Sequence, residues 1–244
     1  MIRLLRISAL PFIFCALLAM AAPGSARAIE LIRDAEIERT LDRISDPLFR
    51  AAGLSPAVVN IYIVNSPDLN AFVAGGQNIF LHTGLLTRLE TVDQLRSVIA
   101  HETGHIAGGH LTRRNEALKG ARGVAALGML GALAATAAGS PEAGLAIVST
   151  SQQAALRNAL SHSRAEEAAA DQAGLRFLAY SRSDPAAFLE VMRLFQATEG
   201  VIGSGRTSYT RTHPLWSERL ALIQEKVREL PKRSEIDPEI VYWH

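Results

Sequence analysis

Cysteine is almost absent from this sequence of 244 residues, because the only one, Cys15, lies inside an apolar run near the N-terminus. No small-residue lipobox precedes Cys15 and hydrophobic residues follow it, so we expect no lipidation there. Removal of the N-terminal segment would leave no cysteine at all. Disulfides and thiolate metal ligands are then excluded, and any metal must be held by histidine and carboxylate groups.

The sequence also lacks an excess of charge of either sign. Its 25 basic and 24 acidic residues give a formal net charge of +1, and 48% of all residues are hydrophobic. Residues 1–28 hold three arginines and no acid, so their removal changes the net charge to about −2. Such a chain has no polyanion-binding character, and we expect no nucleic-acid partner. Its length and composition suit one folded domain with a short appendage.

Residues 1–28 have the pattern of a secretory signal peptide. Arg3 and Arg6 precede the apolar run 7–22, and Ala-Arg-Ala at 26–28 supplies the small residues that a signal peptidase reads. We expect cleavage after Ala28 and secretion of the mature chain across a membrane. The alternative is an uncleaved membrane anchor, for which the apolar run is short.

The rest of the chain is expected to be mainly helical, with a small sheet. Apolar residues at helical spacing predict an amphipathic helix over 30–52, and β-branched residues predict a strand over 58–64. Runs at 71–74 and 78–81 around Gly75-Gly76 predict a hairpin. Further helices are predicted over about 91–114, 156–180, 185–200 and 215–230.

The central motif is His101-Glu102-Thr103-Gly104-His105, on a helix that opens with the capping box of Thr91 and Gln94. Two histidines four residues apart share one helix face and can bind one zinc ion. Glu102 can then reach a metal-bound water as a general base. The alternative is a pair of surface histidines, but the apolar neighbours indicate a buried helix, where unpaired polar groups are costly.

A catalytic zinc needs a third protein ligand. His110 is close in the sequence, but on a helix that continues to about residue 114 it points about 180° away from His101. We therefore interpret His110 as a surface residue or a support for the site. Glu167 and Asp171 share a face of the later helix, where alanines permit close helix approach. On spacing alone, such a pair of carboxylates is more often a solvated face than a pair of ligands.

The ordered motifs resemble the gluzincin metallopeptidases of the HtpX, BepA and CAAX-prenyl-protease type. They are HExGHxxxxH at 101–110, SRxxExxxD at 163–171, Thr-His-Pro at 212–214 and Arg219 in the next helix. The likeness covers about residues 55–225 and includes the hairpin, where Ala74 replaces the usual proline. It implies an α+β, mainly helical, zincin-like domain over 29–230, with a small antiparallel sheet beside the HExxH helix and a tail over 231–244.

The resemblance also implies roles for particular residues. Glu167 would be the third ligand of one zinc ion, Asp171 would orient a ligand histidine or assist proton transfer, and Arg164 would pair with acids in the site. His213 would stabilise the oxyanion or occupy the open zinc position as a latch. The alternative for His213 is a turn histidine that precedes a proline.

The leading hypothesis is therefore a zinc metalloendopeptidase of envelope protein quality control. The resemblance implies secretion across the inner membrane to the periplasm, in solution or associated with the membrane, and substrates that are unfolded or misassembled envelope proteins. Two alternatives are a chaperone-like zinc protein with a closed protease site and a structural zinc protein. Residues 120–148 are rich in alanine and glycine and are broken by Pro141. We expect them to form a soluble helical hairpin or lid, while membrane insertion and peripheral membrane contact stay open as alternatives.

Overall fold

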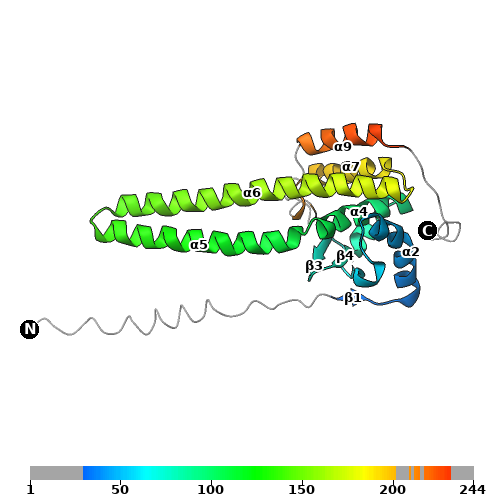
Figure 1. Ribbon diagram of the computed structural model, residues 1–244, viewed down its shortest axis with the longest axis horizontal. Helices are drawn as coiled ribbons and strands as arrows, with labels where there is room; N and C mark the ends of the chain where they lie inside the picture. The colour runs from blue at the N-terminus through cyan, green and yellow to red at the C-terminus, as the bar shows by residue number, and fades with distance from the viewer. Residues whose placement is uncertain (1–29, 202–208, 210–211, 215–216, 232–244) are drawn as a thin grey trace, which may run out of the picture. The chain divides into compact units, whose positions relative to one another are not determined.

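The computed structural model describes residues 30–201, 209, 212–214 and 217–231 (Figure 1). The predicted signal segment and all of the predicted tail except Pro231 lie outside the described residues. In chain order the elements are β1 (Leu31–Ile32), α2 (Ala35–Ala51), the 3-10 turn η1 (Pro56–Val58), β2 (Asn60–Val64), β3 (Ala71–Ala74), β4 (Asn78–His82), α3 (Thr83–Leu86), α4 (Val92–Ala107), α5 (His110–Ala137), α6 (Pro141–Tyr180), α7 (Ala186–Val201) and α9 (Ser217–Glu229).

The sheet is small, as predicted, but it is mixed and not purely antiparallel. Its order is β1-β2-β4-β3, and β2 pairs with β4 in parallel. The predicted β3–β4 hairpin forms, with Gly75 and Gly76 at positive φ in its turn. The prediction of antiparallel pairing holds for β1–β2 and β3–β4 and is wrong for β2–β4, because β3 takes the outer edge and β2 meets the second strand of the hairpin. β3 is an edge strand, and it packs against α4.

The first helix begins later than predicted. Its N-cap is Asp34, whose side chain accepts hydrogen bonds from the backbone N–H groups of Glu36 and Ile37. The residues before this cap are extended, and Leu31 and Ile32 pair with β2. The cap therefore fixes the boundary between strand and helix that apolar spacing alone had placed at residue 30.

α4 begins as predicted and ends sooner. The hydroxyl of Thr91 accepts a hydrogen bond from the Gln94 backbone N–H at 3.2 Å. The helix stops at Ala107, not near residue 114, because Gly109 adopts φ +63°, a conformation that a helix cannot continue through. A new helix, α5, starts at His110.

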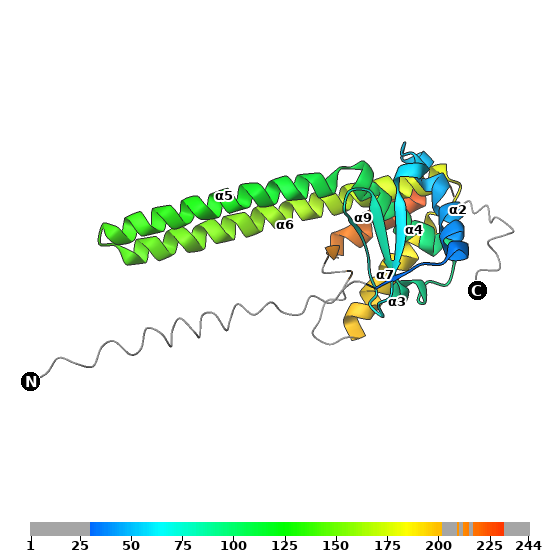
Figure 2. The same cartoon turned by 90° about the horizontal axis from the view of Figure 1, so that it is seen from below.

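α5 and α6 form a long antiparallel pair, and both views show them side by side (Figures 1 and 2). The break at Ser140-Pro141 lies where the sequence placed it, with Pro141 at the start of α6. The helix predicted over 156–180 is correspondingly longer, since α6 runs without interruption from Pro141 to Tyr180.

α4 is the central element of the core. It packs against α2, α6, α7 and the strands β3 and β4. Leu95, Val98, Ile99 and Ala100 are buried in this core, and the next residues, His101 and Glu102, are buried with them. Burial of each large aliphatic side chain contributes about 1.5–3 kcal/mol. The apolar half of α4 therefore anchors the polar motif in the protein interior.

Candidate metal centre

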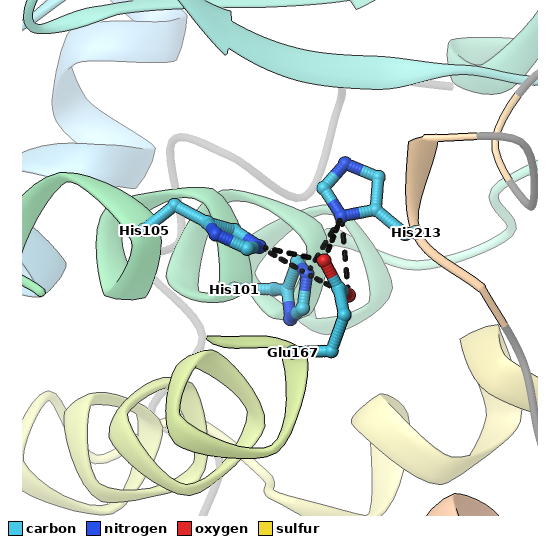
Figure 3. Close-up of side chains that lie close together, drawn as sticks. All are labelled: His101, His105, Glu167 and His213. Atoms are coloured by element: carbon cyan, nitrogen blue, oxygen red, sulfur yellow. Dashed lines mark hydrogen bonds and ion pairs between the residues drawn. The ribbon is translucent and has the colours of Figure 1, made fainter. Parts of the chain in front are cut away.

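Four side chains from three segments meet in the core (Figure 3). His101 and His105 come from α4, Glu167 comes from α6, and His213 comes from the segment before α9. One ligand atom from each lies within 4.8 Å of the others. The sequence had nominated all four, on elements far apart in the chain.

The spacing of these atoms fits a tetrahedral metal. The Nε2 atoms of His101 and His105 are 3.1 Å apart, and each lies 3.3 Å from an oxygen of Glu167. Nδ1 of His213 lies 3.0 Å from Glu167 and 3.2 Å from His101. Ligand atoms held tetrahedrally at zinc bond lengths are separated by roughly 3.4 Å. This nitrogen and carboxylate set is therefore well matched to Zn²⁺.

Close helix approach brings Glu167 to the histidines. A Cβ added at Gly104 would lie 2.7 Å from the backbone oxygen of Ala170, and one at Gly174 would lie 3.1 Å from the backbone nitrogen of His101. α4 and α6 can approach this closely only because these positions carry no side chain.

A buried network of ion pairs lies behind the ligand residues. Nδ1 of His101 lies 2.9 Å from Oδ1 of Asp171. Asp171 in turn accepts hydrogen bonds from Nε and Nη2 of Arg219, at 2.6 and 2.7 Å. Nη1 of Arg219 lies 3.0 Å from Glu167 and donates to the carbonyl oxygen of Pro214, beside His213. Arg219 thus connects α6 to the segment that carries His213.

The charges in this network perturb the titration of its members. Burial lowers the pKa of His101, but pairing with Asp171 and Glu167 raises it more, to about 9. Burial raises the pKa of Asp171, and the stronger opposing effects of Arg219 and His101 keep it below its usual value. Nδ1 of His105 faces His110 and no carboxylate of the described residues, and burial lowers the pKa of His105 to about 3.

The structure corrects the role expected for Arg164 and the reason for which His110 was placed outside the ligand set. Arg164 is exposed on α6, and Arg219 is the guanidinium that lies against the buried acids. His110 is outside the ligand set, as expected, but not because a continuous helix turns it away. The break at Gly109 brings its Nδ1 to 2.9 Å from Nδ1 of His105, on the ring edge opposite the shared ligand atoms.

Tyr209 belongs to the site and was not anticipated. Its buried ring stacks on His213, with centroids 4.6 Å apart, and on Phe195 at 3.8 Å. The backbone N–H of His213 donates to the Tyr209 carbonyl at 2.7 Å. The spacing of four residues between Tyr209 and His213 was the available signal, since it places both on one helical turn.

Comparisons with known proteins agree with this geometry. Residues 32–227 match the model of peptidase family M48. The beta-barrel assembly-enhancing protease of Yersinia pestis is 28% identical over 200 residues, which cover 82% of this chain and 41% of that protein. Its namesake in Escherichia coli strain K12 is 29% identical over 203 residues, with the same coverage. The mitochondrial metalloendopeptidase OMA1 of Schizosaccharomyces pombe is 26% identical over 195 residues, covering 80% of this chain and 54% of that protein. The chain therefore spans less than half of the length of the bacterial relatives.

Proposed function

This chain belongs to peptidase family M48, a family of zinc metallopeptidases, and from that premise we propose that it is an endopeptidase of envelope protein quality control. The observation that carries the proposal is the buried cluster of His101, His105, Glu167 and His213 around one point, with Glu102 beside it. A structural zinc site would not need the carboxylate of Glu102 beside its ligands.

His101, His105 and Glu167 are the proposed zinc ligands. They come from α4 and α6, and Asp171 and Arg219 contact His101 and Glu167. Zinc bound there would supply a Lewis acid that polarises a peptide carbonyl and lowers the pKa of water.

Glu102 is the proposed general base. Both of its carboxylate oxygens are buried and accept no hydrogen bond from the described residues. Burial raises the pKa of Glu102, which increases its basicity. A carboxylate so placed can take a proton from the attacking water and return it to the leaving amine.

His213 gives the site two possible states. Its Nδ1 lies with the ligand atoms, and its Nε2 lies 3.4 Å from Glu102. A catalytic zinc keeps one position open, whereas four protein ligands close it. We propose that the observed arrangement is a resting state, which His213 must leave before substrate binds. The same observation favours the second candidate function, a chaperone-like zinc protein whose site stays closed.

The edge strand β3 is the proposed substrate platform. Its first residue follows Asn70, and the Leu69 carbonyl accepts a hydrogen bond from the backbone N–H of Tyr209, in the segment that carries His213. An extended peptide that pairs with β3 would therefore pass beside the metal ligands. Unfolded or misassembled envelope proteins offer such extended segments. The names of the bacterial relatives and the predicted signal peptide support a periplasmic setting.

Metal analysis and casein cleavage on purified protein test these assignments together. Wild-type protein should bind one zinc per chain and cleave casein. Glu102→Gln should retain zinc and lose cleavage, whereas Glu167→Ala should lose both. His213→Ala should retain zinc and cleave faster if His213 closes the site.

Other outcomes would contradict the proposal. Purified wild-type protein without stoichiometric zinc would rule out both candidate functions. The chaperone-like function would be favoured if wild type and His213→Ala both retained zinc and neither cleaved casein. Both proteins should then protect an unfolded protein from aggregation.

A further inference from the structure

In the α5–α6 hairpin, large apolar residues face outward and small residues face the other helix, which is the opposite of a water-soluble helix pair. Large apolar side chains point outward, and five of them are between 63% and 73% exposed: Leu127, Met129, Leu130, Leu133 and Leu145. Small residues make the contact between the helices. A Cβ at Gly128 would meet the Ser151 side chain at 2.7 Å, and one at Gly144 would meet the Ala132 carbonyl at 2.8 Å. Small residues inside and leucines outside are typical of helices packed in lipid.

The exposed apolar residues do not form a narrow stripe. At about 100° per residue, four of these residues lie within an arc of about 160° on the outer side of α5. They are Leu127, Met129, Leu130 and Leu133. A partner helix covers a narrower stripe, so a second copy of this chain would leave much of this arc in water. A hydrocarbon layer would cover all of it.

Four hydroxyl groups among the described side chains of the hairpin are satisfied within their own helices. Side-chain hydroxyls donate to carbonyl oxygens three or four residues earlier, at 2.7 to 3.0 Å; the donors are Thr136, Ser149, Thr150 and Ser151. Between Arg122 and Arg157 the only charged residue is Glu142, beside the tip. Hydrocarbon offers no hydrogen-bond partners, and these four hydroxyls need none from outside.

The base of the hairpin is basic. Arg113, Arg114, Lys119 and Arg122 are exposed on α5, with one acid, Glu116, among them. From Arg122 to the tip at Gly139 the helix rises about 25 Å, close to the ~30 Å hydrocarbon layer of a bilayer. By length and composition, α5 could cross a membrane. Charge and length together match a bilayer with anionic headgroups at the base.

We propose that residues 123–156 insert into an anionic lipid bilayer, with the four basic residues of the α5 base at the phosphate groups. Glu142 then approaches the opposite headgroup region. α5 begins at His110, which contacts His105, so insertion holds the metal centre about 18 Å from the level of Arg122. The inference does not depend on the proposed activity, because lipid contact requires only the hairpin.

A fluorophore at one position of the full chain tests the proposal. Leu130→Cys is made in a Cys15→Ser background and labelled with nitrobenzoxadiazole, and Leu222→Cys on α9, where Leu222 is 54% exposed, is the matched control. Vesicles of equal parts phosphatidylcholine and phosphatidylglycerol are added. The probe at 130 should shift to the blue, gain intensity severalfold, be quenched by doxyl groups on the acyl chains and be protected from iodide. The probe at 222 should show none of these changes.

The basic residues provide a second measurement. Replacement of Arg113 and Arg114 by glutamine should raise the lipid concentration for half-maximal signal about fivefold per residue on the anionic vesicles. If iodide still quenched the probe at 130 in the presence of vesicles, the proposal would be wrong. This holds even if the N-terminal segment binds the chain to the vesicles. A probe already buried without lipid, in a species of dimer size, would also overturn it and assign the surface to a second copy.

Discussion

Nδ1 of His101 lies 2.9 Å from Oδ1 of Asp171, while Nε2 of the same ring lies 3.3 Å from Glu167. A carboxylate at Nδ1 fixes the tautomer and orientation of the ring and leaves Nε2 free to bind a metal. We expect Asp171→Asn to weaken zinc binding by about 10–100-fold. Competition with a chromophoric chelator measures this affinity.

The matched control is Glu166→Gln, since Glu166 lies on the same helix and outside the ligand set. Its zinc affinity should equal that of the wild type. If Asp171→Asn also kept wild-type affinity, the ring of His101 would be held by packing alone.

Arg219 should be essential for stability as well as for the site. It is 1% exposed and pairs with Asp171 and Glu167. Arg219→Met leaves two buried carboxylates without this cation, and we expect the free energy of unfolding to fall by about 3–5 kcal/mol. Arg219→Lys should recover part of the loss, because it restores the charge without the bidentate fork.

Urea denaturation of the metal-free protein measures this effect. Arg113→Met is the control, because Arg113 is an exposed arginine 3.8 Å from Glu166 and should contribute only about 0–1 kcal/mol. Equal losses in the two variants would mean that the buried network contributes no more than a surface pair.

Sequence periodicity predicted the mainly helical fold, the hairpin and the break before Pro141 because each has a local cause. Apolar spacing identifies helices, and paired glycines or a proline identify turns. The mixed sheet could not be predicted this way, since the order of strands depends on which edge the hairpin presents to β2. The end of α4 was missed because Gly108-Gly109 can lie inside a helix or end it, and the sequence does not show that Gly109 adopts a positive φ.

For the site, spacing alone nominated His101, His105 and Glu102, since all three lie on one helix. The family resemblance, which the family match confirms, was needed to choose Glu167 and His213. No local pattern connects α4 to residues more than 60 positions away. Arg219 and not Arg164 holds the buried acids because α9 folds back against α6, a tertiary contact. The catalytic and ligand roles themselves stay predictions until the variants are measured.

Gly104 should be irreplaceable for reasons of space. A Cβ there would lie 2.7 Å from the Ala170 backbone oxygen, which cannot move without α6. Gly104→Ala should therefore displace Glu167 from the histidines and reduce zinc affinity by at least about tenfold. Gly123→Ala is the control, because nothing lies within 4 Å of a Cβ there and alanine favours the helix by up to ~1 kcal/mol. Equal zinc affinity in both variants would show that the helices can separate without cost to the site.

His82 should make the fold sensitive to acid independently of the metal centre. It is buried at the end of β4, and its ring meets the edge of Phe72 at a centroid distance of 5.9 Å. Burial lowers its pKa below 6.5, and the charge of Asp68 opposes this only in part. The unfolded chain, in which the pKa of histidine is about 6.5, therefore binds the proton first as pH falls.

The stability that neutral His82 contributes is thus complete above pH 6.5 and is lost as pH falls from there through the lower pKa of the folded state. His82→Leu removes this titration while it keeps an apolar side chain in place. As pH falls from about 7.5 to about 5.5, we expect the free energy of unfolding of the wild type to decrease relative to that of His82→Leu. Urea denaturation of both proteins with a chelator present measures it, and the titration of the metal ligands cancels in the difference. A difference that stays constant with pH would mean that His82 gains access to water in the folded state.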